Sequence, residues 1–296
     1  MSVKSRHIGR NARRFYIGMC GVGLVGAFTV AVPGIGSAAT ALPANCTAAG
    51  STVTCTYEYT GGEQSFAVPA DVTSVRVVAT GQQGASETYL PGGLGAIASG
   101  TVPVAAGSTL FVVVGGFLGF NGGGNVNQNR SFGGGASDVR TVSSADAGGT
   151  LASRLLVAGG GGGASGLGFT SRGNPGGNAG TAAPGERAGQ PGTATGGGAP
   201  GEGQGGQPGV LGAGGGSDAG GGGGGFYGGG GGGYDAEGPS GEMGGGGGGS
   251  SLVPPGGSVT LAAAGAAPQV VISYEIGGQS SCLGLPSQLS FFCSLS

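Results

Sequence analysis

Short runs in which apolar and polar residues alternate recur along most of the chain. Such alternation puts every second side chain on one face of a strand, so each run predicts a β-strand with one buried face. Gly, Pro, Asn and Asp separate the runs, as expected for strands joined by turns. The predicted strands are 52–59, 64–69, 73–80, 95–104, 108–116, 136–142, 153–163, 257–265 and 268–276.

No run beyond the N-terminal segment has a convincing helical period, so the sequence predicts an all-β fold. Strands at short, regular intervals with Gly and Pro turns are typical of a β-sandwich. We assign residues 40–158 to its first strands and 250–276 to its last strands. The run 64–69 ends at a proline, which favours a strand at the edge of a sheet.

The segment 159–249 interrupts this pattern with 46 glycines in 91 residues. One interpretation is a flexible low-complexity insert. The other is a set of extended glycine segments that pack side by side, since glycine alone lets backbones touch on all sides. The runs 228–233 and 244–249 would each span roughly 19 Å in polyproline-II geometry, about one strand length. Segments 169–178 and 234–243 then read as turns at the ends.

The first 39 residues read as a secretion signal. A basic region precedes an apolar run from Phe15 to about Ile35, and small residues follow in 36–44. We expect cleavage near Ala39 or Ala41, by the general or the twin-arginine route, with a retained membrane anchor as the alternative. The basic residues are Lys4, Arg6, Arg10, Arg13 and Arg14.

After this cleavage the chain keeps six arginines and thirteen acidic residues, a net charge of −7, with no lysine and no histidine. A negative chain without lysine argues against nucleic acid or a membrane surface as partner. A His-dependent triad, a His–metal site, a P-loop and a Schiff-base lysine are excluded by composition. We therefore expect a non-enzymatic protein without metal or cofactor.

Four cysteines follow the signal: Cys46, Cys55, Cys282 and Cys293. An even number in a secreted chain predicts disulfides, and three connectivities are possible. We favour Cys46–Cys55 and Cys282–Cys293, because each pair closes a short loop. Gly50 and Ser51 can turn a hairpin within the first loop. The second pair lies in the C-terminal tail, 277–296.

Five stretches stand in an order seen in secreted bacterial glycine-rich proteins: FAVPADVTSVRVVATGQQG, FVVVGG, GGGASDVRT, RLLVAGGGGG and GGGGGGSS. Over about 52–276 the chain also resembles the extracellular glycine-rich domain of the anaplastic lymphoma kinase and leukocyte tyrosine kinase receptors. The resemblance implies a TNF-like jelly-roll sandwich that carries a bundle of polyglycine-II helices. That domain binds protein ligands in the receptors, and certain phage tail adhesins present binding loops on such bundles. No kinase motif is present here.

Aromatic residues flank the glycine runs, and they either fill gaps against the sandwich or stand exposed at the end of the bundle, where rings suit sugars or protein surfaces. We expect a secreted surface-interaction or adhesion module that binds an extracellular glycan or protein. A structural role in the matrix or cell envelope is the alternative, and ice binding ranks third. The candidate contact residues are Phe169, Arg172, Phe226, Tyr227, Tyr234, Asp235 and Glu237.

Overall fold

The computed structural model describes residues 42–126, 131–146, 150–166, 173–235 and 241–277, which belong to one compact unit, Leu42–Ser296. Within them the chain forms strands and two short 3₁₀-helices, η1 (Phe117–Gly119) and η2 (Thr150–Ser153), so the all-β expectation is confirmed. No helix in this part of the chain is long and apolar enough to span a membrane. The strands are β1 (Cys46–Ala49), β2 (Thr52–Glu58), β3 (Glu63–Ala67), β4 (Ser74–Thr80), β5 (Ala96–Pro103), β6 (Thr109–Val113), β7 (Ser137–Arg140), β8 (Arg154–Ala158), β9 (Ser258–Leu261) and β10 (Gln269–Glu275).

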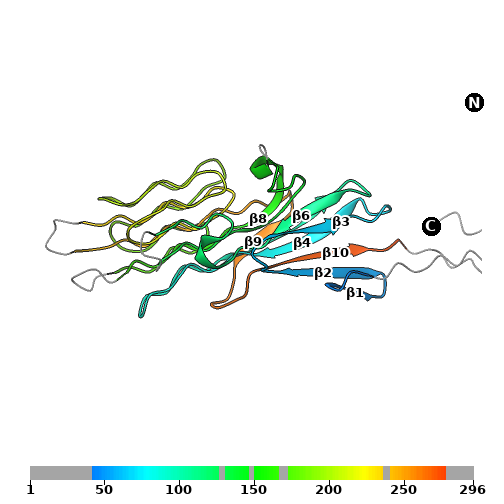
Figure 1. Ribbon diagram of the computed structural model, residues 1–296, viewed down its shortest axis with the longest axis horizontal. Helices are drawn as coiled ribbons and strands as arrows, with labels where there is room; N and C mark the ends of the chain where they lie inside the picture. The colour runs from blue at the N-terminus through cyan, green and yellow to red at the C-terminus, as the bar shows by residue number, and fades with distance from the viewer. Residues whose placement is uncertain (1–41, 127–130, 147–149, 167–172, 236–240, 278–296) are drawn as a thin grey trace, which may run out of the picture. The chain divides into compact units, whose positions relative to one another are not determined.

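The strands form two antiparallel sheets (Figure 1). The first has the order β1-β2-β10-β4-β5-β9, and the second has the order β3-β6-β7-β8. β10 lies between β2 and β4, with Val270 opposite Tyr57 on one side and Ala79 on the other. Strands that are far apart in the sequence are thus neighbours in one sheet.

The apolar positions of the strands meet in one core between the sheets. Along β4, Val75, Val77 and Ala79 are buried whereas Ser74 and Arg76 are exposed, which is the alternation seen in the sequence. Side chains of β6 and β8 from the other sheet pack into the same core. Each buried Val or Leu contributes roughly 1.5–3 kcal/mol relative to an exposed one, so the sandwich is stabilised as its pattern predicts.

The predicted strands are all present, although several are shorter than the apolar runs. The edge position predicted for 64–69 is confirmed, because among the described strands β3 pairs with β6 alone. β6 ends at Val113, before the two glycines that close the predicted run 108–116. A Cβ at Gly115 would meet the carbonyl oxygen of Gly135, so the chain already follows another backbone closely at that point.

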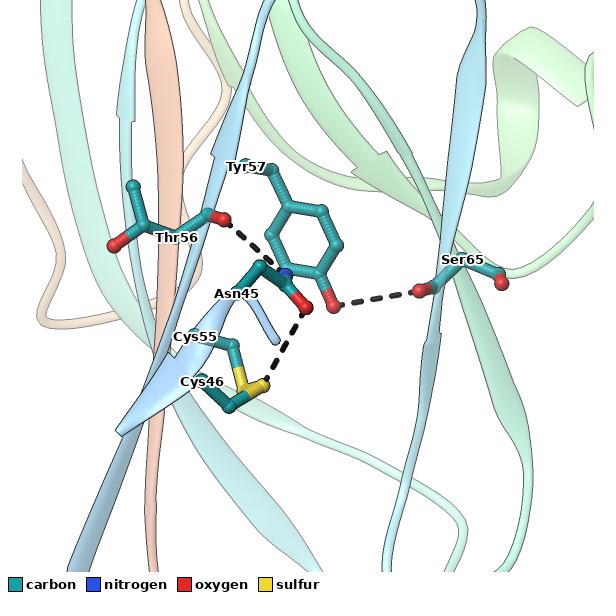
Figure 2. Close-up of a disulfide and its surroundings, with 6 residues drawn as sticks. All are labelled: Asn45, Cys46, Cys55, Thr56, Tyr57 and Ser65. Carbon is teal, nitrogen blue, oxygen red and sulfur yellow. Dashed lines mark hydrogen bonds between the residues drawn. A yellow bond between two sulfur atoms is a disulfide. The ribbon is translucent and has the colours of Figure 1, made fainter. Parts of the chain in front are cut away.

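The disulfide Cys46–Cys55 is confirmed, and it joins residues paired across the β1–β2 hairpin (Figure 2). Gly50 turns the hairpin with φ +61°, which glycine adopts without strain. Beside the disulfide, the Tyr57 hydroxyl donates to the carbonyl of Ser65 at 3.3 Å and so connects β2 to β3 of the other sheet. Burial is the main reason why the pKa of Tyr57 is raised. The second predicted pair, Cys282–Cys293, lies outside the described residues.

A buried ion pair on β7 fixes the loop that follows η1. Arg140 and Asp138 have side chains only 2% and 0% exposed, and Arg140 donates to both carboxylate oxygens, at 2.7 and 2.6 Å. The Asn121 amide donates to Asp138 at 2.8 Å. With its hydrogen bonds satisfied, the pair holds this loop in one arrangement.

Extended segments without strand assignment continue from the sheets, and β8 passes directly into 159–163 (Figure 1). We call the described residues of 81–95, 121–136 and 159–250 the glycine network. Backbone hydrogen bonds join its segments. A Cβ at Gly222 would meet the carbonyl of Gly229, an approach that glycine alone permits.

The hydrogen bonds of the network repeat every three residues. In the run 220–224, Gly220 and Gly223 donate to Gly244 and Gly247, whereas Gly221 and Gly224 donate to Ser131 and Gly134. Gly222 donates to a third segment, at Gly215. The carbonyls of the same run accept from three further segments, at Gly124, at Gly160 and Gly163, and at Gly229 and Gly232. One central run therefore has six neighbours, and its main chain is fully paired.

Three of the four Gly-x-Pro-Gly repeats, those at 189–192, 198–201 and 206–209, form an outer layer of the network. Gln190 donates to Ala199 and Gly209 donates to Gly198, so the three repeats are neighbours. In the first repeat Gly189 and Gly192 donate inward, to Gly245 and Gly248. Pro191 lies between these donors, at the position of the repeat that faces no neighbouring segment. Because proline has no N–H, no donor is left unpaired there.

Candidate functional site

The two predicted turns of the glycine insert start from adjacent points. Ser165 Oγ and Asn174 Nδ2 both donate to the carbonyl of Met243, at 2.8 and 3.0 Å. Ser165 precedes the first predicted turn, 169–178, and Asn174 lies within it, whereas Met243 closes the second, 234–243. We call residues 165–166, 173–174, 186–187, 202–205, 218, 234–235 and 241–243 the loop cluster.

Tyr234 enters the loop cluster from the run 228–233. Its backbone N–H donates to the carbonyl of Gln204 at 3.0 Å, and the N–H of Gln204 donates back at 2.9 Å. Tyr234 also pairs with Met243 across the second turn. Its side chain is half-buried, and a Cβ at Gly205 would meet its ring. The ring is thus held on fixed backbone, with part of its surface free.

Arg187 and Asp235 form an ion pair at 3.0 Å within the loop cluster, with side chains 22% and 32% exposed. The Arg187 guanidinium also donates to the carbonyl of Glu202 at 3.4 Å. Arg187 has φ +55°, a conformation that is uncommon outside glycine and found mostly at special sites. At this exposure the pair is worth at most about 1 kcal/mol, so its main effect is to orient the ends of two segments.

Negative charge dominates the loop cluster. Arg187 is its only basic residue among those that the structure describes, and Asp235 is its partner. Such a surface favours ligands with basic or hydrogen-bond-donating groups. The acidic residues are Glu186, Glu202, Asp218, Asp235 and Glu242.

Phe226 and Tyr227 do not belong to this site, because the glycine run 228–233 separates them from Tyr234. Their rings pack edge to face, with centroids 5.3 Å apart. The Arg154 guanidinium lies 5.3 Å from the Phe226 centroid. Phe226 therefore fills space between β8 and the glycine network, which is the packing alternative considered from the sequence.

Three predicted contact residues, Phe169, Arg172 and Glu237, lie outside the described residues. The residues on either side of them belong to the loop cluster. Of the seven candidates, only Tyr234 and Asp235 can thus be assigned to it from described positions.

A polar depression of about 350 Å³ at the end of the first sheet was not predicted from the sequence. Arg76, Ser273 and Thr101 form a row across β4, β10 and β5 there. Burial and, to a smaller extent, the nearby charge of Asp71 raise the pKa of the Tyr274 phenol beside it. The sequence signal for this depression was the polar residues at the outward positions of β4 and β10. Because outward positions are polar in most sheets that face solvent, this signal does not indicate a depression.

Among the residues that the structure describes, no group of three or more Cys, His, Asp or Glu side chains could hold a metal ion. A scan against protein-family models found no family that matches the chain, and a search of curated proteins found no match either.

Proposed function

We propose that the glycine network is a bundle of polyglycine-II helices on a jelly-roll sandwich. A polyproline-II-type helix has three residues per turn, so residues three apart face the same neighbour. The three-residue repeat of hydrogen bonds in 220–224 supports this assignment, as do its six neighbours. Such a bundle needs no apolar core, because main-chain bonds and close backbone packing stabilise it.

We further propose that the protein is a secreted, non-enzymatic interaction module that binds an extracellular glycan or protein through the loop cluster. The N-terminal basic and apolar segment and the disulfide Cys46–Cys55 support export. The observation that carries the binding role is the Met243 carbonyl, which accepts from both Ser165 and Asn174. It unites the bases of two turns rich in aromatic and charged residues on one hydrogen-bonded platform. Preorganisation of this kind lowers the entropic cost of binding.

Hydrogen exchange of the full chain tests the platform. Amides of 220–224 and 228–233 should exchange at least about a hundredfold more slowly than in an unstructured peptide, because each is bonded inside the network. Exchange at the unstructured rate beside a protected sandwich would remove the basis for the role of the loops.

Binding is tested with a glycan array and with pull-down from an extracellular extract, using the variants Tyr234→Ala and Tyr227→Ala. Loss of an aromatic anchor typically weakens binding tenfold or more, so Tyr234→Ala should do so. Tyr227→Ala, distant from the loop cluster, is the matched control and should keep wild-type affinity if its unfolding midpoint is unchanged. Saturable binding that Tyr227→Ala weakens and Tyr234→Ala leaves intact would refute the assignment of the site, and absence of any saturable binding would refute the role.

A further inference from the structure

A groove of about 370 Å³ lies on the glycine network near η1, and none of its lining residues belongs to the loop cluster. Residues 82–86, 116–118 and 132–134 line it. Phe117 and Leu118 are 76% and 67% exposed beside the groove, and Leu118 has φ +54°. No lining residue carries a charge. The groove therefore offers apolar side chains and main-chain groups to a neutral ligand.

In the segment 82–86 the backbone hydrogen bonds also repeat every three residues, but not every position of the repeat has a neighbouring segment to bond to. Gln82 and Ala85 donate to Gly135 and Phe132, and their carbonyls accept from Gly161 and Ala164. Within the described residues, the backbone N–H and C=O groups of Gln83 and Ser86 make no hydrogen bond. The segment is thus hydrogen-bonded to neighbouring segments through Gln82 and Ala85, and the backbone groups of Gln83 and Ser86 make no hydrogen bond to a neighbouring segment among the described residues.

Gly133 lines the opposite wall of the groove, and its carbonyl oxygen lies against Gly123, where an added Cβ would meet it. Gly133 donates to Gly124 at 3.1 Å, whereas its carbonyl accepts no hydrogen bond from a described residue. Two lining residues that are three apart, Gln83 and Ser86, therefore have backbone N–H and C=O groups without a partner among the described residues.

We propose that this groove binds an extended, glycine-rich segment of a partner polypeptide, which adds one more member to the network. In such a segment the N–H groups of residues three apart face the same way, roughly 9 Å from each other. Gln83 and Ser86 are themselves three residues apart in an extended segment, so their carbonyls match that spacing. Glycine is needed where the added backbone approaches the network, and Phe117 and Leu118 cover its outer side.

The mode of binding corresponds to strand addition at a sheet edge, where main-chain hydrogen bonds supply affinity. An oligosaccharide also carries donors, but its hydroxyls do not repeat with the three-residue spacing of a polypeptide. The spacing of the backbone groups therefore favours a peptide as the ligand. Binding of a sugar is the alternative that the test must distinguish.

The test is a titration of the isotope-labelled full chain, followed through amide resonances. One probe is a peptide of eight glycines with a lysine at each end, and its matched control has N-methylglycine in place of every glycine and so lacks the donors. The glycine peptide should give saturable shifts at Gln83, Ser86, Phe117 and Leu118, with affinity at least tenfold above that of the control. Phe117→Ala should weaken binding several-fold, and Tyr89→Ala, whose side chain is 84% exposed outside the groove, should not.

The proposal is overturned if the glycine peptide gives no saturable shift at these residues, or if both peptides bind equally. Saturable shifts of the same residues by chitohexaose or cellohexaose, with none from the peptide, would also overturn it. The amide spectrum of the Phe117→Ala variant is the control for folding. If it matches the wild-type spectrum away from residue 117, weaker binding is not caused by unfolding. Because the groove lies outside the loop cluster, either result leaves the Tyr234 test unaffected.

Discussion

Arg154 of β8 holds the backbone of Phe226 while stacking on its ring. Nη1 of Arg154 donates to the carbonyl of Gly225 at 2.8 Å, Nη2 donates to that of Phe226 at 3.0 Å, and the guanidinium lies 5.3 Å from the ring centroid. Burial is the main reason why the pKa of Arg154 is lowered. One side chain of the sandwich thus secures the end of a central glycine run.

Arg154→Ala should destabilise the protein by about 2–4 kcal/mol, because the carbonyls of Gly225 and Leu151 lose their donor and the Phe226 ring loses its cation. Urea unfolding measures the change. Arg76→Ala, which removes an exposed arginine of β4, is the control and should stay within about 0.5 kcal/mol of wild type. Equal effects of the two substitutions would contradict the role assigned to Arg154.

Gly229→Ala should cost at least about 3 kcal/mol, since its Cβ would meet the carbonyl of Gly247 in a fully packed segment. Gly62→Ala is the matched change, because its Cβ has nothing within 4 Å and its φ is not left-handed. It should be neutral or stabilise slightly through the unfolded state. Thermal unfolding of both variants compares the two positions, and tolerance of Gly229→Ala would contradict close backbone packing.

Glu63 should make stability depend on pH in the acid range. Burial alone would raise the pKa of this carboxylate, but hydrogen bonds from the Ser143 hydroxyl and the Ser144 N–H, both 2.6 Å, outweigh it and lower the pKa. A lowered folded-state pKa contributes stability above the unfolded value of about 4.3, and that contribution is lost as pH falls through the folded value.

Glu63→Gln should therefore unfold at a lower temperature than wild type at pH 7, and the difference should shrink towards zero near pH 3. Glu58→Gln serves as control, because its carboxylate receives no hydrogen bond from a described residue. A difference between Glu63→Gln and wild type that stays constant from pH 7 to pH 3 would contradict this assignment.

The prolines of the Gly-x-Pro-Gly repeats should keep the outer layer of the network from pairing with other molecules. Edge strands of sheets are protected from association in the same way. The combined variant Pro191→Ala, Pro200→Ala and Pro208→Ala restores three N–H donors, and sedimentation velocity should show self-association that rises with concentration. Pro43→Ala, outside the network, should sediment as wild type, and a triple variant that does the same would argue against protection by proline.

The sandwich was predictable because its signals are local. Alternation predicted every strand except β1, the proline at 69 marked the edge strand, and the nine-residue spacing of Cys46 and Cys55 indicated the hairpin disulfide. Each of these features depends on neighbours within a few residues, which is what a periodic pattern records.

The membership of the glycine network was not predictable in the same way. Gly93 donates to Gly162 and Gly134 donates to Gly161, so segments outside 159–249 join it. Their partners lie far along the chain, and a glycine carries no side chain to indicate which backbone it will approach. The contact of Phe226 with Arg154 was missed for the same reason, because nothing near Phe226 in the sequence specifies β8.

The triplet repeat of hydrogen bonds also constrains how a gene for this protein can change length. Deleting one glycine from 228–233 would rotate every following amide by about 120° and direct it to the wrong segment. An insertion or deletion of three codons would return the amides to their original directions. In a strand of the sandwich, an insertion or deletion of two codons would keep each side chain on its original face. Glycine runs of this kind are therefore expected to grow and shrink by whole turns.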